Sequence, residues 1–252
     1  MRLDKYLSEQ FGSRTKAAYA ISKKLVRING KPVQPSYDYR DGDKIEILTA
    51  EENYVSAGGF KLSKAIKDFN YPVSGKIFAD IGASTGGFTD CLLQNGAQKV
   101  YCIDIGESQL DRSLLDKNIV VIDNFNARNL KASIFSEDLD GVVIDVSFIS
   151  LTYILEGVSN ILSDGAHVLA LIKPQFECES RKVGKGGIVH SSETRQKILQ
   201  KILDFSVKCN LIPQNLTNAP IVSGKNMEYI VLLEKGAECK IINTELIKSV
   251  EL

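Results

Sequence analysis

Between residues 76 and 173, short apolar segments alternate with segments of helical pattern. The apolar segments are KIFADIG, KVYCIDIG, NIVVID, GVVIDV and HVLALIK, and helical spacing recurs near 88–95, 108–115 and 150–163. Nearly continuous apolar runs of this length are typical of strands that are buried on both faces. The alternation therefore predicts an α/β fold in which helices cover both faces of a mostly parallel sheet.

Further elements flank this alternating region. A helix is predicted at 60–70, and a long helix at 191–209 is followed by two strands near 211–219 and 227–234. The tight segment at 223–226 joins these strands, so we expect the sheet to end in an antiparallel hairpin. The predicted large domain is a Rossmann-like sheet that spans 60–252.

The N-terminal end has a different pattern. Two short helices are predicted at 4–11 and 14–25, with Gly12 ending the first and Ser13 capping the second. VRINGKPV then places an Asn-Gly turn between two β-rich stretches, and 37–48 ends in another strand. We therefore expect a small α+β domain at 1–49, followed by a linker at 50–59.

Charge is segregated along the chain. The 31 basic and 31 acidic residues give a formal net charge of zero. Residues 1–49 hold ten of the basic and six of the acidic residues, which leaves 21 and 25 for the rest, and 14–31 holds six basic residues and no acidic one. A basic N-terminal domain favours phosphate binding at that end, although solvated charges can also serve solubility alone.

Several classes of protein are disfavoured by composition. The five cysteines are scattered and never spaced C-x-x-C, which argues against a disulfide framework or a structural zinc site. The two histidines are distant from one another, so we expect no metal site. No apolar core of a signal peptide follows the opening residues MRLDK, so we expect no secretory leader, and no run approaches the roughly 18 apolar residues that span a bilayer. These features predict a soluble, cytoplasmic protein.

A glycine-rich segment, DIGASTGGF, follows the first strand of the large domain and opens a helix. Small residues let the backbone approach a ligand, and a helix N-terminus offers unpaired N–H groups. Asp104 ends the next strand, where a carboxylate can accept hydrogen bonds from both hydroxyls of a ribose. Such glycines can also serve only a tight turn. A strand, a glycine loop, a helix and an acidic strand end in this order favour a cofactor pocket instead. Its predicted residues are Asp80, Gly82, Ala83, Ser84, Thr85, Gly86, Gly87, Phe88 and Asp104.

The spacing of the glycines distinguishes two adenosine cofactors. NAD sites favour G-x-G-x-x-G, in which the second glycine makes room for a pyrophosphate. Here the pattern is G-x-x-x-G-G, without a glycine at that position. S-adenosylmethionine has no phosphate, so we expect it rather than NAD. An antiparallel strand in the sheet agrees with this choice, because methyltransferase sheets have one and plain dinucleotide-binding sheets usually lack it.

Four charged residues lie at the edge of the predicted sheet where open α/β sheets bind ligands. Asp145 follows GVVI, Lys173 follows HVLALI, Glu228 is in NMEYIVLL, and Lys61 begins the helix before the first strand. Any one of them could simply mark the surface at a strand end. Four together favour a catalytic group.

Several segments along the chain resemble those of a known family. YVSAGGFKL, DIGASTGGFTDCLLQNGA, NARNL, DVSFISL, KPQFE, VGKGGIVH and NMEYIVLL are similar to those of the haemolysin A (TlyA) family of ribosomal RNA methyltransferases, from Arg2 to about Glu234. The large domain also resembles the wider FtsJ-like 2′-O-methyltransferases, which use a Lys-Asp-Lys-Glu tetrad. By matching motifs, the tetrad falls on Lys61, Asp145, Lys173 and Glu228.

The resemblance implies S-adenosylmethionine-dependent methylation of ribose 2′-hydroxyls in ribosomal RNA, at cytidine-type sites, without a metal. In-line methyl transfer depends on alignment, and the hydroxyl must lose its proton. Lys173 could take that proton if burial, Lys61 and the cofactor's charge favour its neutral form. Asp145 and Glu228 would then orient the lysines.

This chain departs from the family pattern at a few positions. The family usually has arginine where this chain has Ala57 and His190, and its Glu-x-Thr-Asn pattern appears here as Asp123-Asn124-Phe125-Asn126. The resemblance implies that Asp123 and Asn126 contact the adenosyl group.

The N-terminal pattern RLDKYL…SRTKAAYAISKKLVRINGK resembles the α-L RNA-binding domain of a small-subunit ribosomal protein and of tyrosyl-tRNA synthetase. Such domains bind RNA mainly through phosphates and 2′-hydroxyls. The partner implied is ribosomal RNA or a ribosomal subunit. The predicted RNA-binding residues are Arg2, Lys5, Arg14, Lys16, Lys23, Lys24, Arg27 and Lys31.

Two other functions remain as alternatives. A membrane-active haemolysin would need an apolar span or a strongly amphipathic helix with a basic face, and the sequence has neither. A non-catalytic RNA-binding factor for ribosome assembly would not need both the tetrad and the cofactor loop.

Overall fold

The computed structural model describes residues 1–11, 14–22, 25–47, 54–115, 117–178, 184–220, 225–238 and 243–251. The chain forms two compact units, Met1–Asn53 and Tyr54–Leu252. Across the described ranges, no helix is both long and apolar enough to cross a membrane.

The small unit packs two helices on an antiparallel sheet of order β2-β1-β3. Asn29 and Gly30 have φ angles of 52° and 77°, which a type I′ hairpin turn requires at both central positions, so the predicted hairpin is confirmed. Leu3, Ile21 and Val26 are fully buried in its core. The elements are α1 (Leu3–Tyr6), α2 (Arg14–Ser22), β1 (Val26–Ile28), β2 (Lys31–Pro32) and β3 (Ile45–Ile47).

The first helix is shorter than the range predicted from the sequence. It ends at Tyr6 instead of continuing to residue 11. The hydroxyl of Ser8 donates to the carbonyl oxygen of Lys5 at 2.7 Å, a local hydrogen bond of the kind that competes with helix propagation. The predicted break at Gly12 and cap at Ser13 lie outside the described residues.

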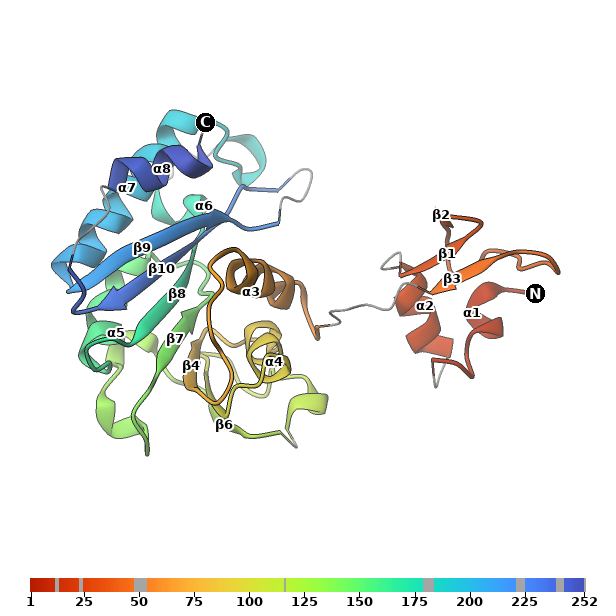
Figure 1. Cartoon of the computed structure of the whole chain (residues 1–252), viewed down its shortest axis with the longest axis horizontal. Helices are drawn as coiled ribbons and strands as arrows, with labels where there is room; N and C mark the ends of the chain where they lie inside the picture. The colour runs from red at the N-terminus through yellow and green to blue at the C-terminus, as the bar shows by residue number, and fades with distance from the viewer. Residues whose placement is uncertain are drawn as a thin grey trace. The chain divides into compact units, whose positions relative to one another are not determined.

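The large unit is built on a seven-stranded sheet of order β6-β5-β4-β7-β8-β10-β9 (Figure 1). The first five strands in this order pair in parallel, and β10 lies antiparallel between β8 and β9. The predicted antiparallel hairpin is therefore present. The strands are β4 (Ile77–Ile81), β5 (Lys99–Ile103), β6 (Ile119–Ile122), β7 (Gly141–Ile144), β8 (His167–Ile172), β9 (Leu211–Asn218) and β10 (Tyr229–Lys235).

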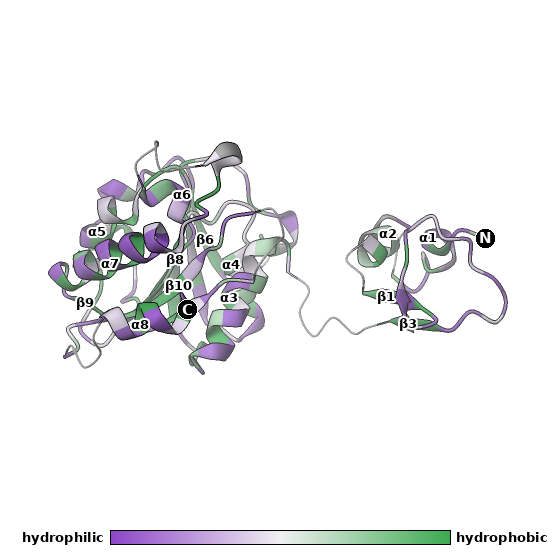
Figure 2. Cartoon of the chain, turned by 90° about the horizontal axis from the view of Figure 1, so that it is seen from above, coloured by the Kyte–Doolittle hydropathy of each residue, from purple (hydrophilic) through white to green (hydrophobic). Residues whose placement is uncertain are grey.

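Helices cover both faces of this sheet (Figures 1 and 2). Successive residues of a strand point to opposite faces, so Phe78 joins the core under α3 and α4, and Ala79 joins the core under α5, α7 and α8. The apolar strands lie inside the unit, and the side of α7 that faces the viewer is mostly hydrophilic (purple in Figure 2). These helices are α3 (Ala57–Asp68), α4 (Gly87–Gln94), α5 (Leu155–Asn160), α7 (Ser192–Lys208) and α8 (Asn243–Val250).

Helix α3 begins within the segment that we expected to be a linker. A β-carbon on Gly59 would lie 2.2 Å from the ring of Tyr54, and one on Gly87 would lie 2.2 Å from the Ser56 hydroxyl. Gly59 and Gly87 therefore allow Tyr54 and Ser56 to pack closely against α3 and α4. This packing lets the helix start at Ala57, three residues earlier than predicted.

Two predicted helices are shorter than expected, and among the described residues two short α-helices were missed. In place of the helix near 108–115 there is a single 3-10 turn, Arg112–Leu114, which begins at Arg112 because the Asp111 carboxylate caps it by accepting from Ser113 N at 2.9 Å. The helix near 150–163 is divided into a 3-10 turn, η4 (Leu151–Tyr153), and α5. The missed helices are α6 (Pro174–Glu177) and α8, and the start of the segment joining β9 to β10 lies outside the described residues.

Candidate active site

The glycine-rich segment forms a tight loop between β4 and α4. Gly82 has a φ angle of 83°, and a β-carbon there would lie 2.8 Å from the backbone oxygen of Asp145. Gly86 has a φ angle of 90°, and its missing β-carbon leaves space for Leu114. Both positions therefore require glycine, which brings the backbone of the loop against the end of β7.

Asp104 connects this loop to the segment after β5. One carboxylate oxygen accepts from Ser84 N at 2.8 Å, and the other accepts from Gly106 N at 2.7 Å. A carboxylate has about four acceptor positions. Asp104 can therefore hold both loops and still accept from a ligand.

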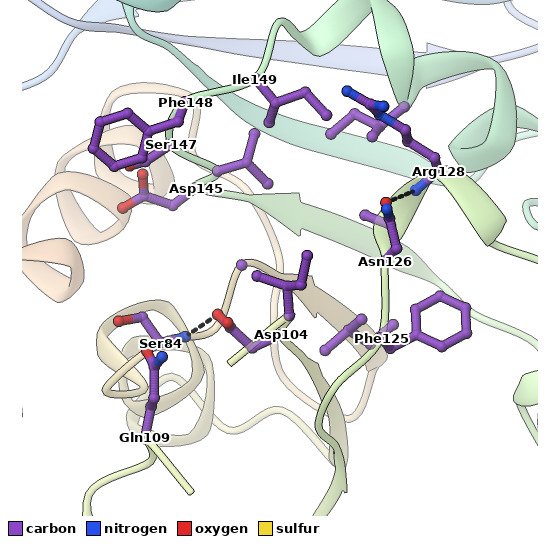
Figure 3. A pocket seen from close by; sticks show the side chains of 16 residues that line it. Ser84, Asp104, Gln109, Phe125, Asn126, Arg128, Asp145, Ser147, Phe148 and Ile149 are labelled. Atoms are coloured by element: carbon purple, nitrogen blue, oxygen red, sulfur yellow. Dashed lines mark hydrogen bonds between the residues drawn. The ribbon is translucent and has the colours of Figure 1, made fainter. Parts of the chain in front are cut away.

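A cavity of about 590 Å³ opens at the carboxyl ends of the parallel strands (Figure 3). Ser84, Asp104 and Gln109 lie along one side of it, Asp145 and Phe148 lie on another, and Phe125, Asn126 and Arg128 come from the segment after β6. A smaller cavity of about 160 Å³ adjoins it, and both are lined by Gly82, Ser84, Asp145 and Ser147. The smaller one also reaches Ala83, Thr85, Gly87, Phe88, Ser56, Gly58 and Lys173.

Three of the predicted cofactor residues do not line these two cavities. Gly86 makes the turn into α4, and Asp123 accepts a hydrogen bond from Ser108 N at 2.9 Å. Asp80 is fully buried in β4, where it accepts from the Thr89 hydroxyl at 2.6 Å. Its other oxygen has no hydrogen-bond partner among the described residues, and burial raises the pKa of this carboxyl to about 7.

The four predicted catalytic residues form two ion pairs. Lys173 Nζ lies 2.6 Å from Asp145 Oδ1, although not in line for a hydrogen bond, and it donates to the Ser147 hydroxyl at 2.9 Å. Lys61 Nζ donates to Glu228 Oε2 at 2.7 Å. Lys173 is only 9% exposed, so its charge is largely removed from water and depends on these partners.

The sheet topology explains how these residues meet. Asp145 and Lys173 directly follow β7 and β8, which are parallel neighbours. On the other side of β8, Tyr229 pairs with Ile172, so the preceding Glu228 lies at the same end of the sheet as Lys173. Helix α3 then contributes Lys61 from the face opposite α7.

The small unit presents several of the predicted RNA-binding residues at its surface. Lys5, Arg27 and Lys31 are exposed. Arg2 and Arg14 both pair with the buried Asp4, at 2.8 and 3.3 Å, and each keeps about half of its side chain exposed. The hydrogen bond from Arg2 is the main cause that lowers the pKa of Asp4 to about 2. Lys23 and Lys24 lie outside the described residues, as does the Lys16 side chain.

The sequence analysis missed Ser147 and Phe148, which both closely follow Asp145. Ser147 accepts from Lys173 and lines both cavities. Phe148 has a φ angle of 63°, is 90% exposed, and its ring lies 4.9 Å from that of Phe176. Both residues belong to DVSFISL, one of the segments that resemble the family. Their position in this segment was a signal that could have identified them as site residues.

The sheet order, the antiparallel β10 and the cavities at the carboxyl edge define a Rossmann-like methyltransferase with a separate small domain. The sequence pattern of the FtsJ-like methyltransferases matches residues 54–235, and that of the S4 domain matches residues 1–45. The chain belongs to the FtsJ-like methyltransferase family and carries an S4 domain at its N-terminal end.

Named relatives agree with this assignment. Hemolysin A of Brachyspira hyodysenteriae is 42% identical over 91% of this chain and 98% of its own length. The 16S/23S rRNA (cytidine-2′-O)-methyltransferase TlyA of Mycobacterium tuberculosis is 40% identical over 73% of this chain and 70% of its own. A solved structure from Streptococcus thermophilus, described as a candidate hemolysin, is 36% identical with a TM-score of 0.74, covering 99% of this chain and 94% of that one.

Proposed function

We propose that this methyltransferase transfers the methyl group of S-adenosylmethionine to ribose 2′-hydroxyls of ribosomal RNA in the cytoplasm. The observation that carries the proposal is the buried Lys173, which contacts Asp145 and Ser147 beside the smaller cavity. The S4 domain supplies an RNA-binding unit, and the name of the mycobacterial relative states the same reaction for that protein.

The two cavities suit the two ends of the proposed cofactor. The larger cavity has apolar walls at Ile103, Phe125 and Ile149 for a purine ring, and Asp104 can accept from ribose hydroxyls. The smaller cavity is bounded by loop backbone and by Lys173 and Asp145. We therefore assign the adenosyl group to the larger cavity and the reactive end to the smaller one.

The chain's own residues would orient and deprotonate the hydroxyl. S-adenosylmethionine supplies a methyl group on a positively charged sulfur. Lys173 is the residue to which we assign the proton, and Asp145 and Ser147 restrict where its Nζ can lie. The Lys61–Glu228 pair, partly buried where α3 meets the start of β10, adds a second fixed donor and acceptor for the RNA. Alignment of this kind supplies a large share of the acceleration in displacement reactions.

The test is labelled methyl transfer from S-adenosylmethionine to ribosomal subunits that lack the modification, followed by mapping of the labelled nucleotide. We expect the label on a ribose 2′-oxygen. Label on a base would contradict the proposal, and cofactor binding without transfer to any RNA would favour the assembly factor instead. Binding of the pure protein to liposomes would favour the haemolysin.

Lys173→Arg tests the assignment of the base. A guanidinium stays charged and cannot accept the proton, so the variant should lose roughly 100-fold or more in rate at saturating cofactor and RNA. Lys197→Arg is the matched control, because Lys197 is 72% exposed on α7 and pairs only with Glu193 among the contacts described. A Lys173→Arg rate within a few-fold of wild type would exclude proton transfer to this lysine.

A further inference from the structure

Besides Lys173, a second buried charged residue, Glu177, lies close in the chain to the Lys173–Asp145 pair. It has no part in the reaction proposed above. Glu177 ends α6, four residues after Lys173, and is 7% exposed. Burying a carboxylate is costly, and its burial raises the pKa of Glu177. Such a cost is expected where a carboxylate fixes a functional geometry.

Both oxygens of Glu177 bind the segment that follows Asp145. Oε1 accepts from the backbone N–H of Leu151 at 2.8 Å, and Oε2 accepts from the hydroxyl of Ser150 at 2.5 Å. Leu151 begins η4, so its N–H has no partner within that turn. Glu177 therefore satisfies the start of η4 and ties it to α6.

Two other contacts join the same segments. Lys173 contacts Asp145 and Ser147 at one end, and the rings of Phe148 and Phe176 pack in the middle. Glu177 makes the third attachment, at the far end of 145–150. The segment needs such attachments, because the left-handed backbone at Phe148 costs about 1–2 kcal/mol for a residue with a β-carbon.

We propose that Glu177 is a positioning residue for methyl transfer: its carboxylate holds residues 145–150 against α6, so that Asp145 and Ser147 keep Lys173 at the reacting position. This inference rests on the proposed function. Without the attachment, Phe148 can leave its left-handed conformation and Ser147 moves with it. Lys173 then loses its fixed partners while the S4 domain is untouched.

The experiment compares full-length variants in the methyl-transfer assay. Glu177→Ala should lower kcat at saturating cofactor by about 10- to 100-fold, the loss expected for a displacement of about 1 Å, while KM for RNA stays within about threefold. Glu177→Gln should recover kcat to within about threefold of wild type, because an amide oxygen still accepts from Leu151 N–H and its NH₂ can donate to Ser150. Ser150→Ala should fall between them.

The control and a second measurement make the outcome decisive. Glu193→Ala removes an exposed carboxylate that pairs with Lys197 on α7, and it should leave kcat unchanged. Hydrogen exchange should show faster exchange of residues 145–153 in Glu177→Ala than in wild type. A Glu177→Ala kcat close to wild type, or unchanged exchange in this segment, would overturn the positioning role. If the wild-type protein methylates no RNA, the proposed function fails, and the exchange measurement still decides whether Glu177 orders the segment.

Discussion

Replacing the buried Asp80 by asparagine should change how the stability of this protein depends on pH. In the folded chain the pKa of Asp80 is raised by burial to about 7, from an ordinary 3.8. Between these two values the folded state holds a proton that the unfolded chain has released. The free energy of unfolding therefore falls as pH rises through this window. The asparagine of the variant does not titrate, so it abolishes that fall.

The magnitude follows from the two pKa values. A difference of one in pKa is worth about 1.4 kcal/mol, so ionised Asp80 costs the fold about 4 kcal/mol above pH 7. About 2–3 kcal/mol of this cost develops between pH 5 and pH 8. The asparagine amide replaces the carboxylate whose Oδ1 has no hydrogen-bond partner, so burying the amide carries its own penalty, but this penalty is the same at every pH.

The assay is urea unfolding of wild type and Asp80→Asn, followed by circular dichroism at pH 5, 6, 7 and 8. Groups such as Glu177 and His167 titrate in both proteins and cancel in the difference. The variant should gain about 2–3 kcal/mol relative to wild type from pH 5 to pH 8. A difference that does not change with pH would refute the argument, because it would mean that Asp80 ionises in the folded protein as it does in water.

Three further predictions concern other parts of the chain. Asp104→Ala should weaken S-adenosylmethionine binding by about 1–3 kcal/mol, since it removes an acceptor and releases both loops; unchanged affinity in calorimetry would remove Asp104 from the site. Deleting residues 1–49 should leave cofactor affinity nearly intact and weaken RNA binding, and RNA binding by the intact chain should fall steeply with salt; equal RNA affinity in a filter-binding assay would give the small unit another purpose. Glu251→Ala should lower the free energy of unfolding by about 2–3 kcal/mol, because Arg195, whose side chain is 13% exposed, loses a partner 2.6 Å away. Thermal melting in which Glu251→Ala matches wild type would show that this pair contributes nothing.

Local features of the sequence were sufficient to predict most strands of the sheet. Strands β4, β5, β7 and β8 are buried on both faces, so their apolar runs are nearly continuous and differ plainly from their neighbours. The Asn29–Gly30 turn was equally predictable, because the left-handed conformation at both positions strongly favours these two residues. The helix boundaries were less predictable, since side chains such as those of Asp111 and Ser8 end or begin them through single hydrogen bonds.

The sequence by itself determined the fold class, the glycine loop and the four charged residues at the sheet edge. Which lysine meets which carboxylate was decided only by tertiary structure: Lys61 reaches Glu228 across 167 residues of sequence, and Lys173 reaches Asp145 because β7 and β8 are neighbours. The same is true of Glu177 with Leu151 and of Arg195 with Glu251. A local pattern reflects which face of an element is apolar, whereas these pairs depend on strand order and register, which are set by packing among elements distant in the chain.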